Sequence, residues 1–240
     1  MPGIAFHVLF AQKVISKLTI GVHVKVTPEY SNKFIQGNLI VDMFDREKKR
    51  LTHQYIKYVE GFEVPDMKAV YEMLKENLNN PVVLGIYSHL YLDDKYIKGI
   101  LVPSFVWNEK TIKNPLTGYE VSTKDFWKDK SYGIYGAYTS MNPMLIGDSH
   151  LDLDSIPSNL SMSGIKLFDE GRRKQTWREE LDEYLAESSN FPYTGLVLNY
   201  EEMISKLDMY AEEFVNHLKD IRVVVQNFQG EYLLMPSKAS

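Results

Sequence analysis

The apolar positions along the chain follow a helical pattern in most segments. Residues 4–11 form an apolar run that is long enough for a helix, and residues 67–78 carry apolar side chains at helical spacing. Asn80 and Pro81 supply a cap and a first-turn proline for a further helix over residues 80–94. The pattern predicts a mainly α fold.

The later part of the chain continues this pattern with interruptions. Residues 123–146 predict aromatic-rich helical pieces that are broken at Gly133, Gly136 and Pro143. The clearest late helix starts at Asn199, and Glu202 gives it a capping-box-like pair. Its apolar stripe consists of Met203, Leu207, Tyr210, Phe214 and Leu218.

A small β element accompanies the helices. Residues 19–27 alternate between apolar and polar side chains in the manner of a strand, which places His23 at the surface. Residues 105–121 predict a loop, and residues 222–234 predict a short hairpin that turns at Gln229–Gly230. For Tyr132, Tyr135 and Tyr138 two interpretations are open, the lining of a cleft or the core.

Composition narrows the class of protein. The chain has 240 residues, no cysteine and a net charge of -5. It has no linker-like segment, so we expect one domain over residues 1–240. The mild negative charge argues against a protein that grips long nucleic acid by its phosphates. No apolar run approaches the roughly 20 residues of a transmembrane helix, and no secretory signal pattern opens the chain, which predicts a cytoplasmic location.

A histidine and a carboxylate one turn apart interrupt the apolar helix over residues 80–94. His89 and Asp93 are four residues apart and therefore share one helix face. Gly85, one turn earlier on that face, lets another chain segment come close. An imidazole nitrogen and a carboxylate oxygen placed in this way are able to share a divalent metal ion. They also form a common structural hydrogen bond, in which the carboxylate only fixes the ring tautomer.

Three further polar residues stand near or within apolar segments. His7 lies inside the run of residues 4–11, Asp42 inside the mostly apolar residues 34–44, and His53 shortly after them. Together with His89 and Asp93 they offer five metal ligands in sequence order. The alternative for each histidine is a satisfied core residue without a metal.

The order of these residues resembles a known family. The residues that carry the resemblance are His7, Gly37 with Asp42 five positions later, Thr52-His53, and Gly85-x-x-Ser88-His89-Leu90-x-x-Asp93. This arrangement is similar to the bacterial zinc-dependent phospholipase C family, whose fold is shared with fungal zinc nucleases. The resemblance covers about the first 110 residues. It implies an all-helical domain that gathers zinc ions in a cleft and hydrolyses phosphate esters.

The resemblance also implies how the ligands divide. One zinc ion corresponds to Asp42, His53, His89 and Asp93. A neighbouring zinc ion shares Asp93 and takes His7 with the amino group at the start of the mature chain. Removal of Met1 would expose the amine of Pro2 for this purpose, and a frayed end is the alternative.

The sequence departs from the family at its remaining zinc. Residues 94–100 contain no histidine, and His217 is followed four residues later by Ile221 in place of an acid. His150 lies in an acidic, loop-like stretch that suits a cation or is simply solvated. We therefore expect one or two zinc ions and not three.

The resulting hypothesis is a zinc-dependent phosphoesterase, in which a metal-bound water attacks the phosphorus atom. Asp42 is the expected catalytic residue, which orients or deprotonates that water. The expected substrate is a small phosphate ester or a phospholipid head group, with nucleotides also open. The competing hypothesis is a non-catalytic protein with a structural metal or a ligand pocket. A helical HD-type phosphohydrolase fits less well, because the adjacent His-Asp pair is missing.

Overall fold

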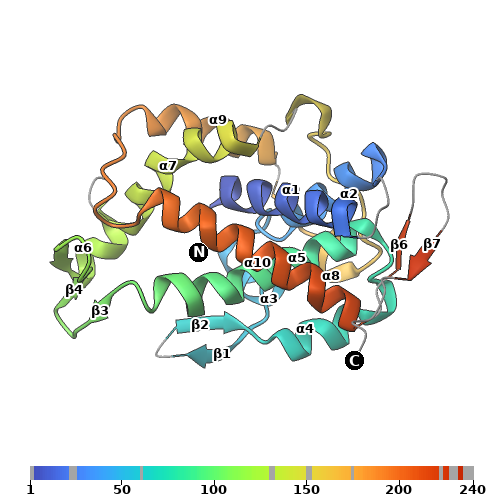
Figure 1. Ribbon diagram of the computed structural model, residues 1–240, viewed down its shortest axis with the longest axis horizontal. Coiled ribbons are helices and arrows are strands. Elements are labelled where there is room, and N and C mark those ends of the chain that lie inside the picture. The colour runs from blue at the N-terminus through green and yellow to red at the C-terminus, as the bar shows by residue number, and fades with distance from the viewer. Residues whose placement is uncertain are drawn as a thin grey trace.

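Helices dominate the computed structural model, which describes residues 3–21, 26–59, 62–129, 133–149, 153–173, 176–221, 224–226 and 232–234 (Figure 1). The mainly α fold with a small β element is confirmed. The α-helices are α1 Ile4–Gly21, α2 Pro28–Ile40, α3 Arg46–Thr52, α4 Met67–Leu74, α5 Pro81–Tyr96, α6 Thr123–Lys128, α7 Ile134–Ser149, α8 Lys166–Asp169, α9 Trp177–Ser188 and α10 Tyr200–Asp220. Shorter 3₁₀ turns lie at Lys75–Asn77 and Leu153–Ser155, and a π-helical turn at Ile97–Leu101 extends α5.

The strands form three small antiparallel sheets. They are β1 Tyr55–Val59 with β2 Phe62–Pro65, β3 Val106–Trp107 with β4 Thr111–Lys113 and β5 Glu120–Ser122, and β6 Val224–Gln226 with β7 Tyr232–Leu234. The predicted C-terminal hairpin is confirmed by β6 and β7, and its turn residues lie outside the described residues. The prediction of a loop over residues 105–121 is wrong in part, because β3, β4 and the start of β5 fall within it. Strands of two or three residues are too short to show an alternating pattern.

Helix α1 occupies the centre of the helical assembly. It contacts α2, α5, α7 and α10, and every side chain from Ile4 to Ala11 is buried. The helix continues to Gly21, so the predicted strand is wrong for residues 19–21. Contacts with these four helices stabilise α1 beyond its apolar start, and a short alternating pattern does not outweigh them. His23 lies outside the described residues.

The crossing of α2 and α5 is unusually close. A Cβ atom added at Gly85 would lie 2.8 Å from the Cα atom of Gly37 and 2.1 Å from the carbonyl oxygen of Phe34. The prediction that Gly85 admits another chain segment is confirmed. The Asn80 side chain accepts a hydrogen bond from the Val82 amide at 2.9 Å, which confirms the predicted start of α5.

Helix α7 differs from its prediction. It begins directly after Gly133, as expected, but it runs through Gly136 and Pro143 without a break. A proline inside a helix costs about 3 kcal/mol. The packing of α7 against α1 and α9 supplies contacts that offset this cost.

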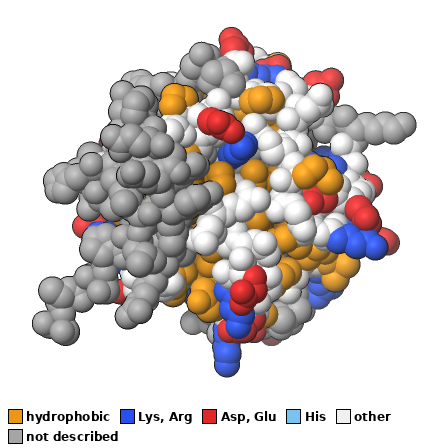
Figure 2. Space-filling view, turned by 90° about the vertical axis from the view of Figure 1, so that its right-hand side faces the viewer, with side chains coloured by type: hydrophobic (Ala, Val, Ile, Leu, Met, Phe, Trp, Pro, Cys, Tyr) orange, Lys and Arg blue, Asp and Glu red, His pale blue; other side chains and the backbone are white. Residues whose placement is uncertain are grey.

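The last long helix follows its prediction. The Asn199 side chain caps α10 by accepting a hydrogen bond from the Glu202 amide at 2.9 Å. All five residues of the predicted apolar stripe are buried. None of the helices in the described ranges is long and apolar enough to cross a lipid bilayer. On the face shown in Figure 2, acidic and basic side chains lie interspersed in the part that is described.

Candidate metal centre

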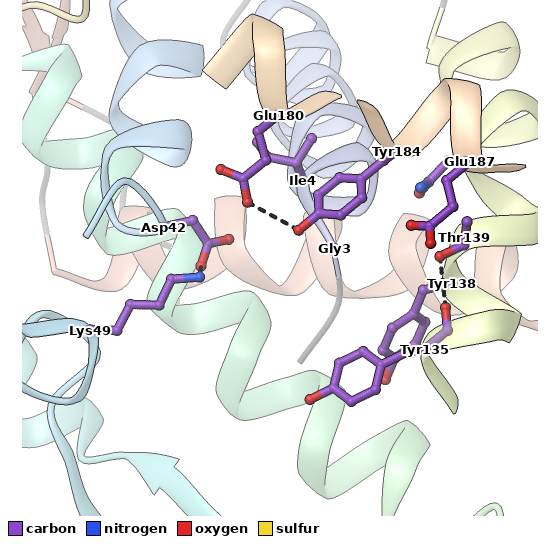
Figure 3. A pocket seen from close by; sticks show the side chains of 11 residues that line it. Gly3, Ile4, Asp42, Lys49, Tyr135, Tyr138, Thr139, Glu180, Tyr184 and Glu187 are labelled. Carbon is purple, nitrogen blue, oxygen red and sulfur yellow. Dashed lines mark hydrogen bonds and ion pairs between the residues drawn. The ribbon is translucent and has the colours of Figure 1, made fainter. Parts of the chain in front are cut away.

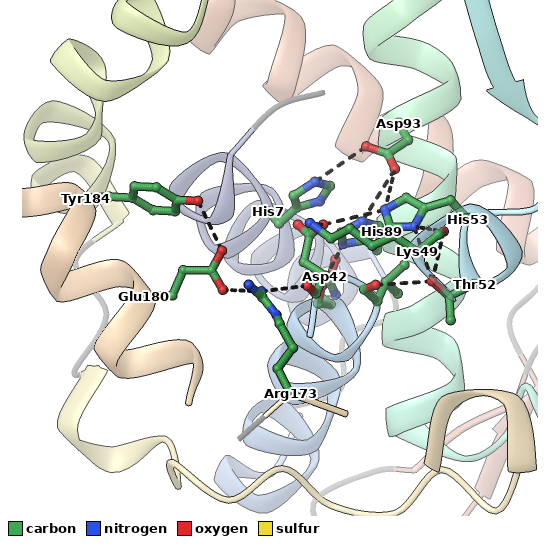
Figure 4. Close-up of polar contacts among 12 residues, drawn as sticks. His7, Asp42, Lys49, Thr52, His53, His89, Asp93, Arg173, Glu180 and Tyr184 are labelled. Carbon is green, nitrogen blue, oxygen red and sulfur yellow. Dashed lines mark hydrogen bonds and ion pairs between the residues drawn. The ribbon is translucent and has the colours of Figure 1, made fainter. Parts of the chain in front are cut away.

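The five predicted ligands converge from four segments of the chain (Figure 4). His7 lies on α1, Asp42 in the turn after α2, His53 directly after α3, and His89 and Asp93 on α5. All five residues are buried, and Asp42 retains the largest exposed fraction, 7%. The structure therefore brings together all five of these predicted ligands.

Asp93 lies at the centre of the cluster. Its Oδ1 atom is 3.5 Å from His7 Nε2, and its Oδ2 atom is 3.4 Å from His89 Nε2 and 3.7 Å from His53 Nε2. These separations exceed the usual hydrogen-bond range of about 2.7–3.2 Å. Two atoms that bind one tetrahedral zinc ion at about 2.1 Å are about 3.4 Å apart. The spacing therefore fits ligands of a shared ion.

Backbone carbonyls orient two of the histidine rings. His89 Nδ1 donates to the carbonyl oxygen of Asn38 at 2.7 Å, and His53 Nδ1 donates to that of Lys49, also at 2.7 Å. A ring that donates through Nδ1 presents the lone pair of Nε2 when it is neutral. This backbone contact is typical of metal-binding histidines, because it fixes the tautomer and the ring direction.

His7 completes the cluster from α1. Its ring stacks on His89 with 3.6 Å between the centroids and 6° between the planes. Burial and the neighbouring His89 lower the pKa of His7 to about 4, so its imidazole is neutral at pH 7. Neither ring nitrogen of His7 makes a hydrogen bond.

The carboxylates of the cluster remain ionised. Burial alone would raise the pKa of Asp93, but His89 and His7 together hold it below its ordinary range. Neither Asp93 oxygen makes a hydrogen bond, although both are buried. Burial likewise opposes ionisation of Asp42, and Lys49 holds the pKa of that carboxyl well below its usual value. A buried carboxylate without hydrogen bonds is costly unless a cation accompanies it.

The ligand atoms form two overlapping groups, each within 4.8 Å. One contains His7, Asp42 and His89, and the other contains His53, His89 and Asp93. Because Nδ1 of His89 donates to the Asn38 carbonyl, only Nε2 of this ring is available for a metal. One nitrogen binds one ion, so His89 is a ligand in one of the two groups and not in both.

One other predicted candidate, His217, does not join the cluster. His217 lies on α10, and its Nε2 atom is 2.7 Å from the hydroxyl of Tyr87. His150 and Pro2 lie outside the described residues.

A pocket of about 380 Å³ lies beside the cluster (Figure 3). Its lining includes Asp42, Lys49, Tyr138, Asn142, Glu180 and Tyr184. Tyr138 is buried and yet lines this pocket, and half-exposed Tyr135 lines it as well. Both open interpretations of these tyrosines thus hold in part, and Tyr132 lies outside the described residues.

Sequence analysis missed the charged residues around Asp42. The ammonium of Lys49 lies 2.7 Å from Asp42 Oδ1, and Arg173 and Glu180 form an adjacent ion pair. Two signals in the sequence could have found these residues. Lys49 lies on α3 four residues before His53, and this spacing places the two side chains on one helix face. Thr176 and Glu179 form a capping box that marks the start of α9, the helix that carries Glu180.

Comparison of the chain with protein-family models, with curated proteins and with solved structures finds no match. The geometry of the cluster and of its pocket therefore carries the functional argument.

Proposed function

We propose that this protein is a metal-dependent phosphoesterase. The observation that carries the proposal is the buried Asp93 carboxylate, whose oxygens make no hydrogen bond and face the Nε2 atoms of His7 and His89 at 3.5 and 3.4 Å. A divalent cation between these atoms would satisfy both the carboxylate and the rings.

Zinc fits the donor set best. Imidazole nitrogens and carboxylate oxygens in a compact group are typical of zinc sites, whereas calcium and magnesium prefer oxygen alone. His53, His89 and Asp93 would supply three ligands, and Asp42 or His7 would supply the next. One or two ions per chain remain the expected number.

The pocket leaves room for a substrate of modest size. Its lining contains one basic residue, Lys49, and three acidic residues, Asp42, Glu180 and Glu187. The Lys49 ammonium lies 2.7 Å from Asp42 Oδ1, at the end nearest the metal ligands, and this is where an anionic phosphate would have to bind. A volume of about 380 Å³ suits a small phosphate ester or a lipid head group.

The ion would supply one part of the chemistry, and Asp42 and Lys49 would supply the rest. A bound zinc ion lowers the pKa of a water molecule towards 7 and withdraws charge from phosphoryl oxygens. Asp42 stays ionised and would accept a hydrogen bond from such a water molecule, which would orient it. Its lowered pKa makes it a weak proton acceptor, so orientation suits it better than deprotonation. Lys49 would donate to the phosphoryl oxygens as negative charge develops on them.

A structural metal site is the second candidate, and one observation favours it. The side chains of His7, His53, His89 and Asp93 are at most 1% exposed. Structural zinc sites are closed by four protein ligands, whereas catalytic sites keep one position open. Asp42 lies at the edge of the pocket, so a substrate would reach the ion from the side of the cluster where Asp42 lies.

Metal analysis tests the site itself. We expect one to two zinc ions per purified chain, and we expect His89→Ala to lose most of this metal because it removes a central ligand. His217→Ala is the matched control and should retain the parental content. Equal loss in both variants, or a metal-free parent that stays folded, would contradict the assignment.

Hydrolysis of aryl phosphodiesters and monoesters with and without a chelator tests the activity. Metal-dependent release of the aryl alcohol supports the phosphoesterase. Zinc binding without turnover of these esters or of short-chain phospholipids would favour the structural site.

Lys49→Met tests the anionic substrate. The change keeps the Lys49 carbonyl that orients His53 but removes the ammonium, so kcat/KM should fall by about 10-fold or more with little change in zinc content. Lys33→Met is the control, because the Lys33 ammonium pairs with Glu29 at 2.7 Å on α2, away from the pocket. If both variants have parental kcat/KM, Lys49 does not contact the substrate.

A further inference from the structure

The position of Asp42 differs from that of the other acid in the cluster. Asp93 lies on the long helix α5, whereas Asp42 lies in the turn between the end of α2 and the start of α3. A turn has no continuous ladder of backbone hydrogen bonds. The direction of the Asp42 carboxylate therefore depends on contacts from other parts of the chain.

Those contacts come mainly from Arg173. Its side chain donates to the carbonyl oxygen of Asp42 at 3.0 Å, and its backbone amide donates to that of Met43 at 2.9 Å. The carbonyl oxygen of Val41 is 3.4 Å from the hydroxyl of Thr52. Arg173 thus holds two of the three consecutive carbonyls of this turn.

Arg173 is in turn fixed by helix α9. The same Nη2 atom lies 2.5 Å from Glu180 Oε2, and the hydroxyl of Tyr184 donates to Glu180 Oε1 at 3.1 Å (Figure 4). Glu180 is only 8% exposed, and both Glu180 and Tyr184 line the pocket. A chain of contacts therefore joins the pocket wall to the turn that carries Asp42.

Two groups contact the Asp42 carboxylate from different directions, the Lys49 ammonium and the His53 ring. Asp42 Oδ1 lies 2.7 Å from the Lys49 ammonium and 3.5 Å from His53 Nε2. The Lys49 side chain is 34% exposed and able to move outward into the pocket. Without a restraint on the turn, the carboxylate would follow Lys49 and leave the other ligands.

We infer that Arg173, held by Glu180, is a positioning residue that keeps Asp42 in the ligand set of the metal centre. This inference rests on the proposed metal site. It adds that residues on the wall of the pocket, which touch no ligand atom, set the affinity of the metal.

The test compares metal binding by the full chain and its variants. Zinc affinity is measured by competition with a chromophoric chelator, and the absorption spectrum of bound Co²⁺ reports the ligand set. Arg173→Met should lower zinc affinity by about 10-fold or more, the effect usual for residues that support metal ligands, and should change the cobalt spectrum. Arg173→Lys should recover part of the affinity.

Arg172→Met is the matched control. Arg172 binds the carbonyl oxygens of Leu160, Ser161 and Phe168 and contacts no metal ligand in the described structure. Its loss should lower the thermal midpoint but leave zinc affinity and the cobalt spectrum unchanged. Where Arg173→Met does not fold, Glu180→Gln replaces it, and a severalfold loss of zinc affinity is expected.

Parental zinc affinity and an unchanged cobalt spectrum in Arg173→Met, or in Glu180→Gln where that variant replaces it, would overturn the inference and leave the metal site intact. A parent chain that binds neither ion would overturn the proposed metal site itself, and the inference with it.

Discussion

Asp93→Asn should abolish the stabilisation that zinc gives to this protein. A ligand present at about 1,000 times its dissociation constant stabilises the folded state by about 4 kcal/mol. For a chain of this size that corresponds to a rise of roughly 8–16 °C in the thermal midpoint. We expect such a rise for the parent, none for the variant, and hydrolysis at background in the variant.

The thermal midpoint of the metal-free protein separates the loss of zinc stabilisation from damage to the fold itself. Asparagine removes a buried carboxylate whose pKa His89 and His7 hold below its ordinary range, so the metal-free variant should melt below the metal-free parent, and the zinc-dependent rise above each metal-free midpoint is the quantity to compare. Asp208→Asn is the control, because this carboxylate is half exposed beside Lys13. The control should keep the full zinc effect. A zinc-dependent rise that survives in Asp93→Asn would show that Asp93 is not a ligand.

Gly85→Ala should destabilise the protein by about 3 kcal/mol or more. The added Cβ would lie 2.1 Å from a backbone oxygen of α2, and backbone cannot move aside as a flexible side chain does. Separation of α2 from α5 would also weaken the bond from His89 to the Asn38 carbonyl. Chemical denaturation measures the first effect, and zinc affinity of the remaining folded protein measures the second.

Gly147→Ala is the matched control for this prediction. Gly147 lies in α7, and an added Cβ would meet no atom within 4 Å. Alanine is favoured over glycine in helices, so this variant should be more stable than the parent by about 0.5–1 kcal/mol. Similar free energies of unfolding for both variants would show that the α2–α5 crossing is looser than described.

The sequence predicts those parts of the fold that local pattern decides. Helix α10 has a cap and a continuous apolar stripe, and Asn80 and Pro81 mark the start of α5. The strands β3 to β5 have two or three residues each, so their pairing depends on contacts that no local pattern records. The continuity of α7 through Pro143 likewise depends on packing against α1 and α9.

The candidate site likewise contains some contacts that local sequence patterns predict and others that they do not. His89 and Asp93 are neighbours because of helical spacing, and Gly85 indicated the close approach that orients His89. In the ion pairs of Asp42 with Lys49 and of Arg173 with Glu180, the second partner lies on a helix, but the positions of Asp42 and Arg173 depend on where a turn and a loop pass in space. Arg173 is far from Asp42 in the sequence, and charged residues in loops usually face solvent. No sequence pattern therefore predicts that the Arg173 side chain binds the Asp42 carbonyl.

The central place of α1 has a consequence for synthesis of the protein. This helix carries His7 and is translated before the other described elements, but two of its packing partners, α7 and α10, are translated much later. All five candidate ligands lie between residues 7 and 93 and are translated before either of these partners. The apolar side chains of α1 therefore stay without their final neighbours until α10 has been translated, a period in which exposed apolar surface favours aggregation.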